Sequence, residues 1–405
     1  MTDRWNEFRQ QMPVAKRWAY FDHAAVAPLS LPASRALADW ADEMAVNGEA
    51  NWSELRRRVG QVRESAATLL NCESDEIAFV PNTTSGVSII AESFPWQAGD
   101  NVVVPANEFP SNALPWRNLM ARGIEVRAVP CDTCSRDAIG CDESRLINAT
   151  DSRTRIVAVS WVDFATGWKQ DLDHLAEQCH QRGILLCVDG IQGAGVIPLD
   201  LRQTPVDFFV ADGHKWLLGP EGAGLLFIRA EHFERLRPIG IGWNSLKSAG
   251  NFDRSPFGLD QNSADDCVPF RVVEPLPAHA LKNSAARFEG GSHNVGGILS
   301  LGASLELLLS FGVPAIWERL SEISVRLREV VSECGGRVIS SNDEHRRSGI
   351  LACDFSGRSL IGWRERAMQR GVILNLRRGL VRLSPHVYIN GADLEKLRDV
   401  LSELG

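Results

Sequence analysis

Short apolar runs alternate with stretches of helical periodicity over the first half of the chain. The runs are rich in branched and aromatic residues and show little polar alternation, which is typical of parallel strands buried on both faces. Strands that alternate with helical segments in this way predict β-α-β units and a mostly parallel sheet. The predicted strands are Ile77–Val80, Val102–Val104, Val126–Val129, Ile156–Val159, Ile184–Val188, Phe208–Val210 and Leu225–Ile228.

The pattern changes near residue 298. Leu299–Leu309 and Ile316–Val331 have the periodicity of amphipathic helices, and shorter elements follow. We therefore predict an α/β protein with a large sheet domain over 21–297 and a smaller α+β domain over 298–405. The later elements are strands near Val338, at Ile350–Phe355 and near Val372–Leu374, with a helix around Leu360–Arg370. Within the large domain, Gly240–Asp266 is rich in Gly, Asn, Ser and Asp and predicts a long functional loop.

Composition narrows the function classes. The 405-residue chain is 44% hydrophobic and carries a net charge of −8. It has no basic tail or patch, so we expect no nucleic-acid partner. The polar start MTDRWNEFRQQ lacks the apolar core of a signal peptide, and no apolar run is long enough to cross a bilayer. We expect a cytoplasmic protein without a membrane partner.

The nine cysteines are odd in number and scattered, which favours reduced thiols over a disulfide framework. Cys131, Cys134 and Cys141 form a local cluster. It lacks a second C-x-x-C and a nearby histidine, so we disfavour zinc and expect no metal site. We interpret this segment as a surface loop after a strand at Glu125–Val129, and its function stays open.

Candidate chemistry lies at the ends of two predicted strands. Asp189 ends one apolar run, and Lys215 follows another by a few residues. Side chains beyond the carboxyl ends of parallel strands face a common crevice. Pyridoxal 5'-phosphate (PLP) needs a lysine amine for its Schiff base and a carboxylate for its pyridine nitrogen. On spacing alone, an ordinary acid and a solvated lysine are an equal alternative.

The segments VDGIQGAG and DFFVADGHKWLLGPEGAGLLF resemble the core of the class V aminotransferases, which are fold-type I PLP enzymes. The resemblance extends from Tyr20 to His386. It implies that residues 1–20 join the small domain, that Lys215 binds PLP, and that Asp189 pairs with its pyridinium. It also implies catalysis on an amino acid through an external aldimine.

Further site residues follow from the resemblance. The segment Asn82–Gly86 opens a helix, whose N-terminus suits a phosphate, although simple N-capping is the alternative. Phe109 falls where the family stacks a ring on the pyridine, with a core aromatic as the alternative. The cofactor residues that the resemblance implies are Thr84, Ser85, Gly86, Phe109, Asp189, Gln192, His214, Lys215 and Ser292.

The resemblance also implies which part of PLP some of these residues contact. Gln192 would bond the phenolic oxygen of PLP, and His214 would contact the phosphate. Asp212 replaces a family serine that binds phosphate, and a carboxylate there would be repelled, so we leave it out. Ser292, in RFEGGS, resembles the residue that reaches the partner subunit's phosphate, which implies a homodimer with shared sites. The match is partial, because Gly290 replaces a frequent proline.

Arg382 matches the family arginine that binds the substrate's α-carboxylate, for which a planar guanidinium is suited. The roles of Arg377 and Arg378 stay open. Desulfurases in the family use a mobile cysteine, but residues 371–385 contain none. Cys353 lies in a strand-like run and Cys334 ends a helix.

With Phe109 in place of the desulfurases' histidine, we expect an aminotransferase, epimerase or β-lyase of the isopenicillin N epimerase-like branch. A cysteine desulfurase or selenocysteine lyase is the alternative. A non-catalytic PLP-fold binding protein is disfavoured by Asp189 and Lys215. A dehydrogenase is disfavoured because no G-x-G-x-x-G opens a helix after the first strand.

Overall fold

The computed structural model describes residues 2–135, 138–250 and 275–403. Within these ranges, seven strands form a central sheet in the order β2-β10-β9-β8-β7-β3-β4, in which only β10 runs antiparallel to its neighbours. The seven predicted strands are confirmed. They are β2 (Ile77–Val80), β3 (Asn101–Pro105), β4 (Glu125–Val129), β7 (Thr154–Ser160), β8 (Leu185–Asp189), β9 (Phe208–Asp212) and β10 (Gly224–Ile228).

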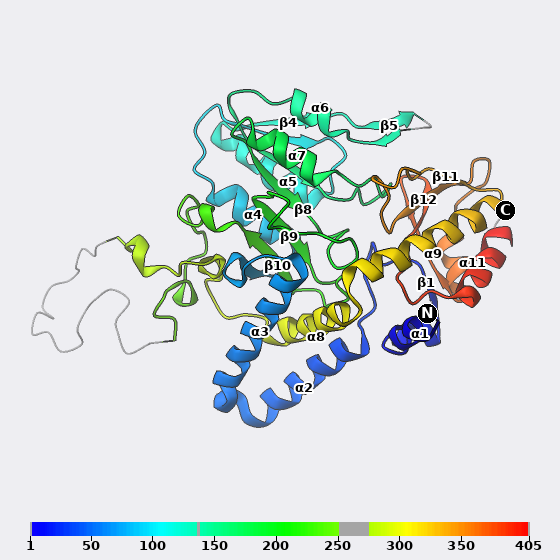
Figure 1. The fold of residues 1–405 in the computed structure, drawn as a ribbon, viewed down its shortest axis with the longest axis horizontal. Coiled ribbons are helices and arrows are strands. Elements are labelled where there is room, and N and C mark those ends of the chain that lie inside the picture. The colour runs from blue at the N-terminus through cyan, green and yellow to red at the C-terminus, as the bar shows by residue number, and fades with distance from the viewer. Residues whose placement is uncertain (1, 136–137, 251–274, 404–405) are drawn as a thin grey trace, which may run out of the picture.

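Helices cover both faces of this sheet, which explains the continuous apolar runs (Figure 1). Successive side chains of a strand point to opposite faces. In β8, Leu185 and Cys187 pack in the core under one set of helices, and Leu186 and Val188 pack in the core under the other. One face is covered by α4 (Thr83–Ser93) and α5 (Pro110–Asn118), and the other by α3 (Trp52–Leu70), α6 (Glu143–Asn148), α7 (Leu172–His180) and α8 (Val295–Phe311).

The C-terminal part is built on a second, antiparallel sheet in the order β11-β12-β15-β14. The long helix α9 leads from the central part to this sheet (Figure 1). These elements match the predicted α+β pattern. They are α9 (Val313–Glu333), β11 (Arg337–Val338), β12 (Leu351–Asp354), α10 (Trp363–Gln369), β13 (Val372–Ile373), β14 (Asn375–Arg377), β15 (Leu380–Leu383) and α11 (Gly391–Glu403).

The N-terminal segment returns to the C-terminal part. The strand β1 (Ala19–Tyr20) pairs in parallel with β13, and α1 (Thr2–Gln10) lies beside α11 (Figure 1). This pairing supports the proposal that residues 1–20 join the small domain. The proposed boundary after residue 297 falls inside α8, which packs on α2 (Leu31–Asn47) and α3, so the division itself stays a proposal.

Three further observations concern the sequence expectations. The segment predicted as a surface loop instead forms a hairpin of β5 (Asp132–Ser135) and β6 (Ala138–Gly140). Such short strands carry too few apolar residues for a clear pattern of period two. Of the predicted loop Gly240–Asp266, residues 251–266 lie outside the described residues. Among the described helices, none alone is long and apolar enough to cross a membrane; only α8 and α9 together pass, across a 79° bend.

Candidate active site

A cavity of about 310 Å³ opens at the carboxyl ends of the central strands. This is where ligands bind in open α/β sheets. The cavity brings together most of the predicted site residues, from β8, β9, α4, the segment before α5 and the C-terminal sheet. Its lining comprises Ala24, Ala25, Val26, Asn82, Thr83, Thr84, Phe109, Ser111, Phe164, Asp189, Ile191, Gln192, Asp212, His214, Lys215, Arg377 and Arg382.

Asp189 is the last residue of β8 and is 2% exposed. Burial raises the pKa of its carboxyl to about 6, although the Ile191 N–H and the charge of Lys215 act in the opposite direction. The Ile191 N–H donates to Asp189 Oδ1 at 3.1 Å. A cationic ring nitrogen placed against this carboxyl would favour its charged form, because a buried carboxylate needs a partner.

Lys215 follows β9 by three residues and is 7% exposed. Burial lowers the pKa of its amine to about 8, and the nearby charge of Arg382 lowers it further, while Asp189 raises it. A sizeable fraction of the amine is therefore neutral near physiological pH. A neutral, desolvated amine is what a Schiff-base lysine requires.

The helix α4 begins at the cavity. The Asn82 side chain caps it by accepting from the Ser85 N–H at 2.9 Å. Thr83 and Thr84 line the cavity, and Thr84 Oγ1 donates to Ser111 Oγ at 2.8 Å. Thr83 was missed from the sequence, although it opens the same motif. Its buried Oγ1 has no hydrogen-bond partner within the described part of the chain, so it suits a ligand oxygen.

Ser85 and Gly86 do not line the cavity. The structure gives Gly86 a packing reason to be glycine. A Cβ atom there would lie 2.4 Å from Val210 Cγ1 of β9, so a side chain would push α4 away from the sheet. Gly86 thus lets the helix N-terminus approach the site. The predicted phosphate contacts of Ser85 and Gly86 stay predictions.

Phe109 flanks the lysine. Lys215 Nζ lies 5.4 Å from the centroid of its ring, and the ring of Phe164 meets it edge-on at 5.1 Å. Phe109 is 38% exposed, so the alternative of a buried core aromatic does not describe it. A planar ligand ring attached to Lys215 would therefore lie beside this aromatic face, where offset stacking is favourable.

Glu108, which the sequence reasoning did not single out, anchors this segment. Its Oε1 accepts from the Ser160 N–H at 2.6 Å and its Oε2 from the Ser160 hydroxyl at 2.5 Å, at the end of β7. Burial raises the pKa of Glu108 to about 8. The neutral form of the Glu108 carboxyl is therefore favoured. Its two hydrogen bonds to Ser160 fix the residue that directly precedes Phe109.

Gln192 already has two protein partners. Its Nε2 donates to the Ala24 carbonyl at 3.0 Å, and its Oε1 accepts from Trp216 Nε1 at 2.9 Å. An amide has two donors and two lone pairs, so one donor stays available for a ligand oxygen. The predicted bond to the phenolic oxygen of PLP is compatible with this geometry and stays a prediction.

His214 and Asp212 form a contact at the cavity wall. His214 Nδ1 lies 2.9 Å from Asp212 Oδ2, although the ring is not aligned for a hydrogen bond. Asp212 Oδ1 accepts from the Gly213 N–H at 2.7 Å. The carboxylate that replaces the family serine therefore faces the histidine and the backbone.

Arg382 lies in the strand β15 and is 1% exposed. Its Nη2 donates to Asp22 Oδ1 at 3.0 Å, and its Nη1 donates to the Phe164 carbonyl at 2.8 Å. Its Nε is buried and has no partner among the described residues. Asn375 Nδ2 also donates to Asp22, at 2.7 Å. Asp22, to which the sequence analysis gave no role, holds the guanidinium.

Ser292 lies away from this cavity. It is exposed and borders a separate cavity of about 140 Å³ beside α3, together with Trp243 and His293. A contact with the cofactor of the same chain is therefore not what the structure shows. The predicted contact with a partner subunit's phosphate stays a prediction.

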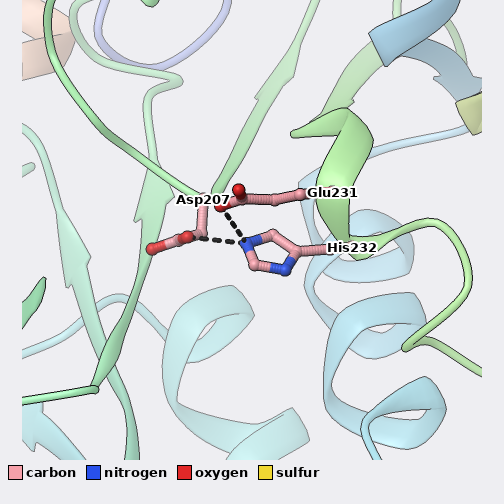
Figure 2. A group of neighbouring side chains, drawn as sticks. All are labelled: Asp207, Glu231 and His232. Atoms are coloured by element: carbon pink, nitrogen blue, oxygen red, sulfur yellow. Dashed lines mark hydrogen bonds and ion pairs between the residues drawn. The ribbon is translucent and has the colours of Figure 1, made fainter.

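A second polar cluster lies at the opposite, amino-terminal end of β9 (Figure 2). Asp207, Glu231 and His232 have the spacing of metal ligands among the described residues. Buried Asp207, however, already contacts His232 Nε2 at 2.7 Å and His180 Nε2 at 2.9 Å, and it accepts from the Leu186 N–H at 2.7 Å. We interpret Asp207 as a buried acceptor whose contacts join three segments, those of His180, Leu186 and His232.

The sequence pattern of the aminotransferase class-V family matches residues 19–265 and 266–363. The chain belongs to the aminotransferase class-V family. A probable cysteine desulfurase of Methanothermobacter thermautotrophicus is 30% identical over 422 residues, which cover 99% of this chain and 98% of the relative.

Solved structures of class V enzymes share the fold. The cystine C–S lyase C-DES, in complex with cysteine persulfide, is 21% identical with a TM-score of 0.85, covering 98% of this chain and 100% of that one. The cysteine desulfurase CsdA of Escherichia coli is 24% identical with a TM-score of 0.82, covering 99% and 98%. The chain thus has the fold-type I architecture and is a PLP-dependent enzyme.

The residues at the cavity fit PLP. Buried Lys215 can form the Schiff base, and Asp189 can pair with the ring nitrogen. The unpartnered Thr83 hydroxyl at the start of α4 suits the phosphate, as does the positive end of the helix dipole.

The depressed pKa of Lys215 gives a pH-dependent prediction. The rate at which PLP attaches to the cofactor-free protein should rise with pH around a midpoint near 8, because the neutral amine is the nucleophile. An ordinary lysine would give a midpoint of about 10.4. The rate is followed by absorbance, and borohydride then fixes the label for peptide mapping.

Lys169 supplies the matched control. Burial also lowers its pKa, but it does not line the cavity, so Lys169→Ala should attach PLP normally while Lys215→Ala should not. Label recovered on a lysine other than Lys215 would contradict the assignment.

Proposed function

We propose that this class V enzyme cleaves the carbon–sulfur bond of a sulfur-containing amino acid by β-elimination. With cysteine as substrate, cysteine and water would yield pyruvate, ammonia and hydrogen sulfide. Transamination and epimerisation start with the same removal of the α-proton, so they are related outcomes of the same site. The similarity to both cysteine desulfurases and a cystine C–S lyase supports a sulfur-containing substrate.

The residues that line the cavity favour elimination over a reaction that needs a protein thiol. Among the described residues, no cysteine lines the cavity. Cys187 lies near Asp189 but is buried inside β8, and burial raises the pKa of its thiol well above the ordinary value. Cys353 lies in β12, where burial raises its pKa to about 12. Neither can move as a nucleophile to the substrate's sulfur.

Each residue of the cavity has a part in this reaction. When bound, PLP supplies an electron sink for the negative charge that develops at the α-carbon. Lys215 Nζ would take the α-proton, for which its depressed pKa is suited. Asp189 would hold a proton on the ring nitrogen. Phe109 offers a flat wall without a titratable group, so the protons at this wall are left to Lys215.

Arg382 and a hairpin of the C-terminal sheet would position the substrate. Arg382 lines the cavity, and its buried Nε has no hydrogen-bond partner among the described residues, whereas Nη1 and Nη2 already have partners. At the turn of the β14–β15 hairpin, Arg378 Nη2 donates to the Asn107 carbonyl at 2.9 Å and stacks near Phe164. This contact joins the hairpin to the segment before Phe109.

Cysteine desulfuration is the second candidate, because the relatives reported above carry that name. It would require a protein thiol to accept sulfur. Cys131 is half-buried and Cys267 lies outside the described residues. The homodimer and the cytoplasmic location expected from the sequence stay predictions.

The co-product of L-cysteine turnover separates the two candidates. Elimination predicts pyruvate and ammonia in equal amounts with sulfide, whereas desulfuration leaves alanine and a protein persulfide. Products are measured by chromatography, with Lys215→Ala as the background. Stoichiometric alanine with a trapped persulfide would contradict elimination. Loss of that persulfide in Cys131→Ser would then identify Cys131 as the residue that accepts the sulfur.

Arg382→Lys tests the carboxylate contact. Lysine retains a charge for Asp22 but lacks the planar fork. Losing one charge-assisted hydrogen bond to the substrate would cost roughly 1.5–3 kcal/mol, so the Kd for amino acids should rise at least about tenfold while PLP stays bound. Spectral titration measures this Kd, and Arg377→Lys, at the other arginine of the cavity, serves for comparison. An unchanged Kd in Arg382→Lys would remove Arg382 from substrate binding.

A further inference from the structure

Two cysteines face each other at the base of the β5–β6 hairpin. Asp132 is paired with Gly140 in this hairpin, so Cys131 and Cys141 occupy the next opposed positions. Directly opposed residues of antiparallel strands have Cα atoms about 4.5–5.5 Å apart. Disulfide-bonded pairs need roughly 4.4–6.8 Å. A disulfide is therefore within reach without a large movement of the backbone.

The two thiols differ in exposure and in charge. Cys131 is half-buried, whereas Cys141 is buried. A hydrogen bond with Cys141 lowers the pKa of Cys131 to about 7, against the effect of burial. The same bond, together with burial, raises the pKa of Cys141. Near neutral pH, Cys131 is thus partly thiolate, the form that attacks a disulfide, while Cys141 keeps its proton.

We propose that Cys131 and Cys141 form a dithiol site that small-molecule disulfides oxidise to an intramolecular disulfide. The Cys131 thiolate attacks one sulfur of RSSR, the S–S bond breaks, and RS⁻ leaves. Cys141 then gives up its proton, attacks the Cys131 sulfur of the mixed disulfide and releases the second RS⁻. Two protein thiols lose two electrons, and RSSR becomes two RSH.

The second step is favoured by the first. In the mixed disulfide, Cys131 no longer carries a negative charge, so one of the causes that raise the pKa of Cys141 disappears. Cys141 then becomes a better nucleophile at the position where it already faces the Cys131 sulfur. Formation of the Cys131–Cys141 disulfide should therefore be faster than further exchange with the small molecule.

The pair contacts the segment that carries Phe109. In its thiol form, Cys131 Sγ donates to Asn107 Oδ1, and Asn107 Nδ2 donates to Asp163 Oδ2 at 3.0 Å. The disulfide lacks the thiol proton that Asn107 accepts. The modification site is thus coupled through one side chain to the wall of the active site, and it does not depend on which reaction occurs there.

The experiment exposes the purified holoenzyme to glutathione disulfide near neutral pH and maps cysteines by alkylation and peptide mass spectrometry. We expect the loss of two thiols and a Cys131–Cys141 cross-link. The other described cysteines, Cys72, Cys179, Cys187, Cys334 and Cys353, are buried and should stay reduced.

Three serine variants distinguish the steps. Cys141→Ser should stop at a glutathione adduct on Cys131, and Cys131→Ser should leave Cys141 unmodified. Cys134→Ser, which changes the neighbouring cysteine of the same hairpin, should still form the cross-link. A Cys131–Cys134 bond, a stable adduct on wild-type Cys131, or no reaction at these residues would overturn the proposal.

Discussion

Asp189 and Lys215 are a carboxyl and an amine buried in one cavity, and the rest of the site is arranged around them. Burial disfavours the charged form of each, so the pKa of Asp189 rises to about 6 and that of Lys215 falls to about 8. Each then suits its task in a PLP enzyme. The lysine is available as a neutral nucleophile. A cationic ring nitrogen beside the buried carboxyl would stabilise its charged form.

The close packing of the sheet ends keeps these groups in place. Gly190 follows Asp189 directly, and a Cβ atom there would lie 1.9 Å from Phe209 Cζ of β9. The turn after β8 therefore needs glycine so that β9 can pass beside it. Gly86 has the same function for α4 above Val210. Two glycines thus bring a helix N-terminus and two strand ends within reach of one ligand.

The sequence predicted the central strands well, because strands buried on both faces produce continuous apolar runs. It also placed Asp189 and Lys215, since their position depends only on where two strands end. It could not predict that Asp22 holds Arg382, because the two are 360 residues apart and meet only after the N-terminal segment pairs with β13. Nor did it predict the β5–β6 hairpin, whose polar residues mimic a loop.

Exchange of the substrate's α-proton with solvent deuterium tests the central claim that Asp189 supports carbanion formation next to Lys215. In D₂O, the wild-type enzyme should exchange the α-proton of its amino-acid substrate, as followed by NMR. Asp189→Asn should keep PLP on Lys215 yet exchange at least about a hundredfold more slowly, because the charge partner of the ring is lost. Glu231→Gln, the same carboxylate-to-amide change at an exposed residue outside the cavity, should exchange normally. Exchange at the wild-type rate in Asp189→Asn would contradict the account.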